Sequence, residues 1–159
     1  MRFTLSIIVL LLFCFTVYGQ EKNYGVIFPS AGLSYQKHLM GEAGVMYGQN
    51  QSLGPCGESR WLYFAGKVGS GFNFDFNHFI LAPKATFECD FTLIGARVGL
   101  VDYTNFKQQD WRLTLETGLT IGGYIDIFYG WNIPVSNTRI PDVAKHSITL
   151  NINFVRDYK

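Results

Sequence analysis

The segment Ser147-Ile-Thr-Leu-Asn-Ile-Asn-Phe154 (SITLNINF), close to the C-terminus, decides the fold. Its odd positions carry Ser, Thr, Asn and Asn, whereas its even positions carry Ile, Leu, Ile and Phe, without exception. A period of two places successive side chains on opposite faces of an extended strand. The segment therefore predicts a β-strand with one polar face and one apolar face.

The same alternation recurs towards the N-terminus and predicts eight strands in total. The other seven are expected at residues 31–36, 42–49, 61–74, 79–91, 94–100, 111–121 and 125–132. The alternation changes parity between Phe91 and Ile94, which indicates a tight turn. No segment has a sustained helical period, and no repeat or low-complexity linker divides the chain. One all-β domain is expected in these 159 residues.

The composition agrees with a β-protein and argues against nucleic acid as a partner. The chain has 17 Gly, 16% aromatic residues and only 16% charged residues, a mixture that suits closely packed strands. The 13 Lys and Arg nearly balance the 12 Asp and Glu, with a formal net charge of +1. Such a charge gives no electrostatic reason to bind nucleic acid.

The first residues predict export. Met1-Arg2 is followed by an apolar run from Leu5 to Val17 and by Val17-Tyr18-Gly19, a signal-peptidase pattern. We expect residues 1–19 to be a signal peptide, cleaved after Gly19, and residues 20–159 to be the barrel domain. The alternative of an anchoring helix needs about 20 apolar residues, and the run is shorter. Lipid attachment at Cys14 is disfavoured because Phe13 precedes it.

The two faces of the strands predict a barrel in a membrane rather than in water. The apolar faces carry many large rings, which the interior of an eight-stranded barrel is too narrow to hold. They are therefore expected to point outward into lipid. The polar faces would then line the interior with four bases and four acids in balance: Lys67, Lys84, Arg97, Arg112, Glu88, Asp90, Glu116 and Asp126. Paired charges can be buried there as structural ion pairs.

The aromatic residues near strand ends and the lengths of the turns give a further check on the predicted membrane barrel. Eight rings are expected to form two girdles at the lipid headgroups: Tyr35, Tyr47, Trp61, Tyr103, Trp111, Tyr129, Trp131 and Tyr158. With the C-terminus in the periplasm, the turns at 91–93 and 122–123 are short, and the outer loops at 103–110 and 134–145 are longer. Residues 50–60 would be an unusually long periplasmic turn, and 75–77 a short outer loop, so the agreement is partial.

A family resemblance is carried by the leader, the Gly- and aromatic-rich strands, the segment Gly123 to Gly130 and the last strand. The chain resembles small outer-membrane β-barrels of the OmpA/OmpX type and is similar to short barrels of Bacteroidota. The resemblance implies a single antiparallel, up-and-down transmembrane barrel in the outer membrane. It also implies contact with outer-membrane lipid and recognition of the last strand by the barrel-assembly machinery. The chain departs from the family because residues 155–159 follow Phe154, so either Phe154 or Tyr158 could be the recognised aromatic residue.

No catalytic, metal or cofactor site is predicted. His146 and Ser147 lie at a rim where some barrel enzymes act on lipids, but strand neighbours point to opposite faces and cannot form a nucleophile and base pair. His38, His78 and His146 are scattered, and no Cys/His spacing suits zinc. Cys56 and Cys89 could form a disulfide in an oxidising compartment, although their spacing does not require it.

The loop from Pro134 to Asp142 is the longest expected outer loop, and Arg139 with Asp142 could form a recognition surface there. The favoured function is a non-catalytic outer-membrane barrel with a structural or surface-binding role. Two alternatives remain open. One is a narrow pore or a lipid-modifying enzyme, and the other is a soluble periplasmic barrel that binds a ligand.

Overall fold

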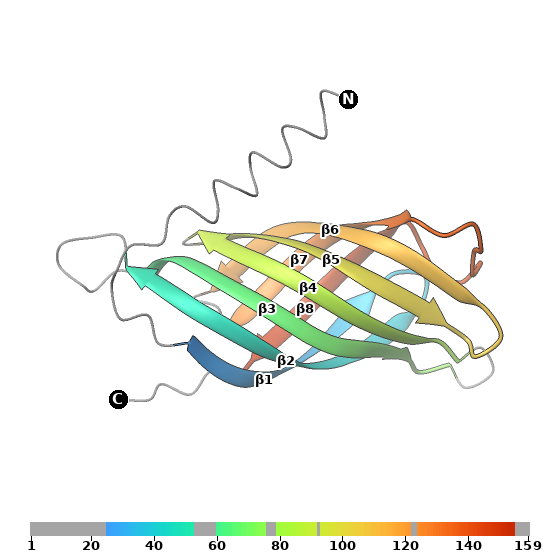
Figure 1. The fold of residues 1–159 in the computed structure, drawn as a ribbon, viewed down its shortest axis with the longest axis horizontal. Coiled ribbons are helices and arrows are strands. Elements are labelled where there is room, and N and C mark those ends of the chain that lie inside the picture. The colour runs from blue at the N-terminus through green and yellow to red at the C-terminus, as the bar shows by residue number, and fades with distance from the viewer. Residues whose placement is uncertain (1–24, 53–59, 76–78, 92, 122–123, 155–159) are drawn as a thin grey trace, which may run out of the picture.

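Alternating residues form long strands, each of which pairs antiparallel with its neighbours in the sequence (Figure 1). The computed structural model describes residues 25–52, 60–75, 79–91, 93–121 and 124–154. The strands are β1 (Gly25–Tyr35), β2 (Leu39–Ser52), β3 (Arg60–Asn73), β4 (Leu81–Phe91), β5 (Ile94–Thr104), β6 (Gln109–Ile121), β7 (Ile125–Pro134) and β8 (His146–Asn153). The all-β fold class and the eight predicted strands are confirmed.

The first and last strands close the sheet into a barrel. β1 pairs with β8 from Ser30 opposite Asn153 to Tyr35 opposite Ile148. Beyond that ladder, the Phe154 amide donates to the Pro29 carbonyl at 3.0 Å. Closure matters because an open edge would present a row of unpaired backbone groups.

The first two strands are longer than predicted. β1 begins at Gly25 instead of residue 31, and β2 continues to Ser52. The start of β1 was missed because both of its faces are apolar there: Phe28 is buried inside, whereas Ile27 and Pro29 are exposed outside. Alternation of polar and apolar residues is therefore absent over this stretch, although the backbone is extended.

The outer face of the barrel is apolar and the inner face is polar, as predicted. In β8 the side chains of Ile148, Leu150 and Ile152 are exposed, and those of Thr149 and Asn151 are buried. The same strict alternation holds along most of β4 and throughout β7. Large rings and branched chains thus cover the surface, and hydroxyls, amides and charges fill the lumen.

The prediction that Tyr103 belongs to an aromatic girdle is wrong. Tyr103 is only 5% exposed and packs inside the barrel with Val101. It lies on the same side of β5 as Arg97, so strand parity places it in the lumen. Tyr35, Tyr47, Trp111, Tyr129 and Trp131 are exposed, whereas the side chains of Trp61 and Tyr158 lie outside the described residues.

The two ends of the barrel differ. At one end, the "terminal end", β1 begins and β8 ends; at the other, the "loop end", β1 leads into β2 and β7 leads into β8. The signal peptide predicted at 1–19 lies outside the described residues. Within the described ranges, no helix has the length and apolar character needed to cross a membrane.

Candidate functional site

The barrel interior is the candidate site because it gathers charged side chains from most of the strands. The structure buries all eight residues predicted there: Lys67, Lys84, Glu88, Asp90, Arg97, Arg112, Glu116 and Asp126. It also buries two acids that the sequence reasoning missed, Glu42 and Asp110. Strand parity could have found both, since Glu42 shares a face with Met46 and Asp110 shares one with Arg112.

Arg97 is the centre of the interior network. Glu88, Arg97 and Glu116 lie directly opposite one another on β4, β5 and β6. Arg97 donates from Nε to Glu88 Oε2 at 2.7 Å, with a second bond from Nη2 to the same oxygen, and from Nη1 to Glu116 at 3.1 Å. Its guanidinium also lies 4.3 Å from the centre of the Phe128 ring, a cation–π arrangement. These contacts hold the guanidinium in one orientation.

Two further ion pairs lie nearer the loop end. Lys84 donates to Glu42 across the lumen. Arg112 donates twice to one carboxylate oxygen, Asp110 Oδ2, at 2.6 Å from Nη2 and 3.0 Å from Nε. Hydrogen bonds between ionised groups are stronger than neutral ones. Each of these two bases therefore has its own acid.

Lys67 has a different kind of partner. Its ammonium donates to Asn151 Oδ1 on β8 at 3.1 Å, and the side chain is almost completely buried. An amide oxygen can accept this bond without neutralising the charge. Lys67 therefore contributes positive charge to the lumen and ties β3 to the far side of the barrel.

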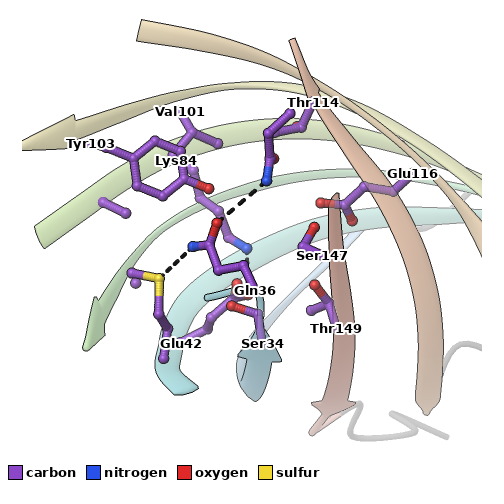
Figure 2. Close-up of a pocket in the computed structure, with 14 residues that line it drawn as sticks. Ser34, Gln36, Glu42, Lys84, Val101, Tyr103, Thr114, Glu116, Ser147 and Thr149 are labelled. Carbon is purple, nitrogen blue, oxygen red and sulfur yellow. Dashed lines mark hydrogen bonds and ion pairs between the residues drawn. The ribbon is translucent and has the colours of Figure 1, made fainter. Parts of the chain in front are cut away.

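A small polar cavity lies among the ion pairs of the loop-end half (Figure 2). Its volume is about 20 Å³, which suits about one water molecule. Drug-sized ligands need pockets of about 300 Å³ or more. Its polar lining includes Glu42, Lys84, Glu116, Asn132, Ser147 and Thr149. The cavity is too small for a sugar or a lipid headgroup.

The loop between β7 and β8 closes the barrel above this cavity. Ile140 and Val143 from the loop are buried in an apolar cluster with barrel residues, and we call this cluster the lid: Met40, Ile80, Ala82, Val101, Tyr103, Ile140 and Val143. Polar contacts fasten the loop to the barrel: the Ile140 amide donates to Asp110 at 3.1 Å, and Arg112 donates to the Ala144 carbonyl at 3.0 Å. The lid therefore rests on a buried ion pair.

The terminal-end half of the lumen is divided between apolar and acidic groups. Phe28, Met46 and Ala65 from β1 to β3 form a second buried apolar cluster, against which Tyr63 packs. Next to it lie Glu88 and Asp90, which are opposite Ala65 and Tyr63 in the ladder between β3 and β4. Together with Asp126 they form an acidic group in which each residue has a carboxylate oxygen within 4.8 Å of those of the other two. Acids are thus concentrated on one side of this half.

The predicted balance of four acids and four bases is wrong. With Glu42 and Asp110 included, the described residues place six buried acids and four buried bases in the lumen: Glu42, Glu88, Asp90, Asp110, Glu116 and Asp126 against Lys67, Lys84, Arg97 and Arg112. Asp102 is also buried but is not counted, because its side chain is on the outer face of β5. Its neighbours Val101 and Tyr103 point into the lumen, and its partner on β6 is the exposed Trp111. With all ten of these described groups ionised, the interior would have an excess of two negative charges.

The two loop residues predicted as a recognition surface have separate partners. Arg139 donates to the carbonyls of Ser136 and Thr138 in its own loop. Asp142 pairs with Lys37 at 3.1 Å, in the turn between β1 and β2. The structure therefore uses Asp142 to join two loops, while Arg139 is half exposed at the loop end.

The remaining residues considered from the sequence are dispersed. The imidazole of His146 lies 2.9 Å from the Tyr129 hydroxyl on the outer surface, whereas Ser147 is buried inside. This separation agrees with the argument that the two cannot act as a catalytic pair. Cys89 lies on β4, whereas Cys56 and His78 lie outside the described residues, so the disulfide stays a prediction.

Comparisons with protein-family models, with curated proteins and with solved structures give no significant match. The strand number, the closure and the antiparallel order are consistent with the small outer-membrane barrel type. Function is therefore inferred from the surface and the interior of this barrel.

Proposed function

We propose that this chain is an integral outer-membrane β-barrel with a sealed interior and a non-catalytic role, structural in the envelope or binding through its loop end. One observation carries the proposal: the apolar side chains face outward all round the barrel while the charges face inward. Every strand contributes a large exposed apolar residue to this belt: Ile27, Val45, Val68, Phe87, Val98, Leu115, Ile127 and Leu150.

A belt of this extent is costly in water. Monomeric soluble proteins rarely expose a continuous apolar patch larger than a few hundred Å², whereas this one surrounds the molecule. Lipid hydrocarbon removes the cost, and a closed barrel is the β-structure that satisfies all of its backbone groups there. The strands are 8 to 14 residues long, which suits tilted strands that need about 9–11 residues to cross a bilayer.

Exposed aromatic residues at both ends support the same proposal. Tyr35, Trp111 and Trp131 lie near the loop end, and Tyr124 and Phe154 lie near the terminal end. Aromatic rings are enriched at the two interfaces of membrane barrels. By analogy with bacterial outer-membrane barrels, the loop end would face outward and the terminal end would face the periplasm.

The packed interior supports a barrel that does not conduct. The lid fills the loop-end mouth, ion pairs cross the middle, and a second apolar cluster occupies part of the terminal-end half. The described cavity is the size of about one water molecule. A continuous wet channel and a lipid-sized active site are both disfavoured by this packing.

Fractionation of cells that express the full chain tests the location. The protein is expected in the outer-membrane fraction, soluble only with detergent, and its migration on a gel should change on heating. A variant without residues 1–19 is the control, and it should stay in the cytoplasm. Recovery of the mature full chain as a dissolved periplasmic monomer would contradict the proposal.

Planar bilayers test the sealed interior. Purified protein should insert without giving a steady conductance, and a known open porin in the same bilayers serves as the control. A continuous ohmic current from the wild-type barrel would show that the lumen is open and would favour the narrow-pore alternative.

A further inference from the structure

The excess negative charge of the lumen is concentrated at one place. Glu88 and Asp126 have no exposed surface and Asp90 is 4% exposed, and their carboxylate oxygens lie within 4.8 Å of one another. The base that contacts this triad is Arg97, which pairs with Glu88, lies 3.6 Å from Asp126 and is shared with Glu116. Three acids and one shared guanidinium leave the triad negative.

Two oxygens of the triad accept no hydrogen bond from a donor group of the described residues, although the Glu88 and Asp90 carboxyl groups can bond to each other by sharing a proton. Glu88 uses Oε2 for Arg97, while its Oε1 is buried without such a donor. Asp90 faces the Thr120 hydroxyl with Oδ2 at 3.5 Å, while its Oδ1 is buried without such a donor. A buried carboxylate oxygen without a partner is expensive, and the usual compensation is a paired charge or a metal ion.

The position of Asp90 also depends on a glycine. A Cβ on Gly95, which lies opposite Asp90 on β5, would collide with Asp90 Oδ1 and lie 2.6 Å from Cζ of Phe128. The bare backbone at this point makes room for a carboxylate in the lumen. Asp126 is held on the other side by Asn153 at 2.7 Å and Thr120 at 2.9 Å, so the triad is fixed from several strands.

We propose that Glu88, Asp90 and Asp126 bind one divalent cation of the calcium class inside the terminal-end half of the barrel. Ca²⁺ takes oxygen ligands at about 2.3–2.6 Å in flexible geometry, so two ligands on opposite sides of the ion are about 5 Å apart. The separations in the triad fit this span. One divalent ion would also cancel the two-charge excess of the six acids over the four bases.

The site is close to the terminal end. Asp90 precedes the last residue of β4, and Asp126 follows the first residue of β7. The ion would therefore enter from that end, opposite the lid. Water would complete the coordination, as is common for calcium sites.

Calorimetry of the full mature chain, stripped with EDTA and titrated with calcium chloride, tests the proposal. The expected result is one ion per barrel, with affinity reduced about tenfold or more by Asp90→Asn, because fewer charged ligands remain. Asp110→Asn is the matched control, a buried acid that contacts Arg112 and the lid, and it should bind calcium as the wild type does.

Thermal unfolding of the same samples distinguishes a triad that binds a calcium ion from a triad whose carboxyl groups are stabilised only by sharing a proton. Calcium should raise the unfolding midpoint of the wild type and leave that of Asp90→Asn nearly unchanged, and Asp126→Asn provides a second variant if the first does not fold. If calcium does not bind the wild type, or if both Asn variants bind as tightly as the wild type, the proposal is wrong. The assay works in detergent or in plain buffer, so it is independent of the proposed membrane location.

Discussion

Substituting an arginine into the middle of the outer apolar belt would distinguish a membrane barrel from a soluble one, and Val68 is the position chosen. Val68 on β3 is 69% exposed and pairs with Val45 and Ala85 on the neighbouring strands. It lies four residues from the exposed Phe72. With a rise of about 3.3 Å per residue and a strand tilt of about 40°, this is about 10 Å along the barrel axis. Val68 is therefore near the middle of an apolar band about 25 Å tall.

Val68→Arg should destabilise the barrel by about 2–4 kcal/mol in lipid, the cost of an arginine at the bilayer midplane. At an exposed site in water the same change should cost about 0.5 kcal/mol or less. Reversible urea unfolding in phospholipid vesicles measures the difference, followed by tryptophan fluorescence. The control is Asn137→Arg, an exposed position in the loop between β7 and β8. Equal stability of the two variants would refute the outward assignment of the apolar face.

Three further predictions concern the interior. Arg97→Met removes the partner of Glu88 and Glu116 and should cost about 3–5 kcal/mol, with partial recovery on adding Glu88→Gln; a urea unfolding midpoint close to the wild type would contradict it. Gly95→Ala should cost about 1–3 kcal/mol because its Cβ overlaps the Phe128 ring, whereas Gly66→Ala, with open space around the new Cβ, should be nearly neutral in the same unfolding assay. Ile140→Asp places a charge in the apolar lid, so limited proteolysis should cut residues 135–145 faster than in the exposed control Asn137→Asp; equal rates would show that the lid does not hold the loop.

The strands and their faces could be predicted because alternation of polar and apolar residues is a local signal. Each strand from β3 onward carries that signal, and β1 was shortened only where Phe28 makes its inner face apolar. The charged lining followed from the same parity. Glu42 was missed because it is the first residue of its predicted strand, and Asp110 was missed because it was assigned to the outer loop 103–110, although β6 begins at Gln109.

Contacts between distant strands could not be predicted in this way. The triad joins two residues of β4 to one of β7, and it depends on how the closed barrel brings these strands across the lumen. The spacing of Cys and His residues gives no information about such a site, because its ligands are carboxylates far apart in the sequence. The lid was hidden for a related reason: Ile140 and Val143 lie in a loop without periodicity.

Net charge and local charge are separate properties of this interior. The whole chain is nearly neutral at +1, yet the register gives Lys84 and Arg112 one acid each and leaves Arg97 to serve several. The loop-end half is therefore neutralised by its own side chains, and it supports the lid through Asp110 and Arg112. The terminal-end half is not neutralised by the described side chains alone, because Glu88, Asp90 and Asp126 share Arg97. Strand register would therefore determine both features of this barrel: the loop end closed by its own side chains, and the terminal-end acids neutralised by a bound ion.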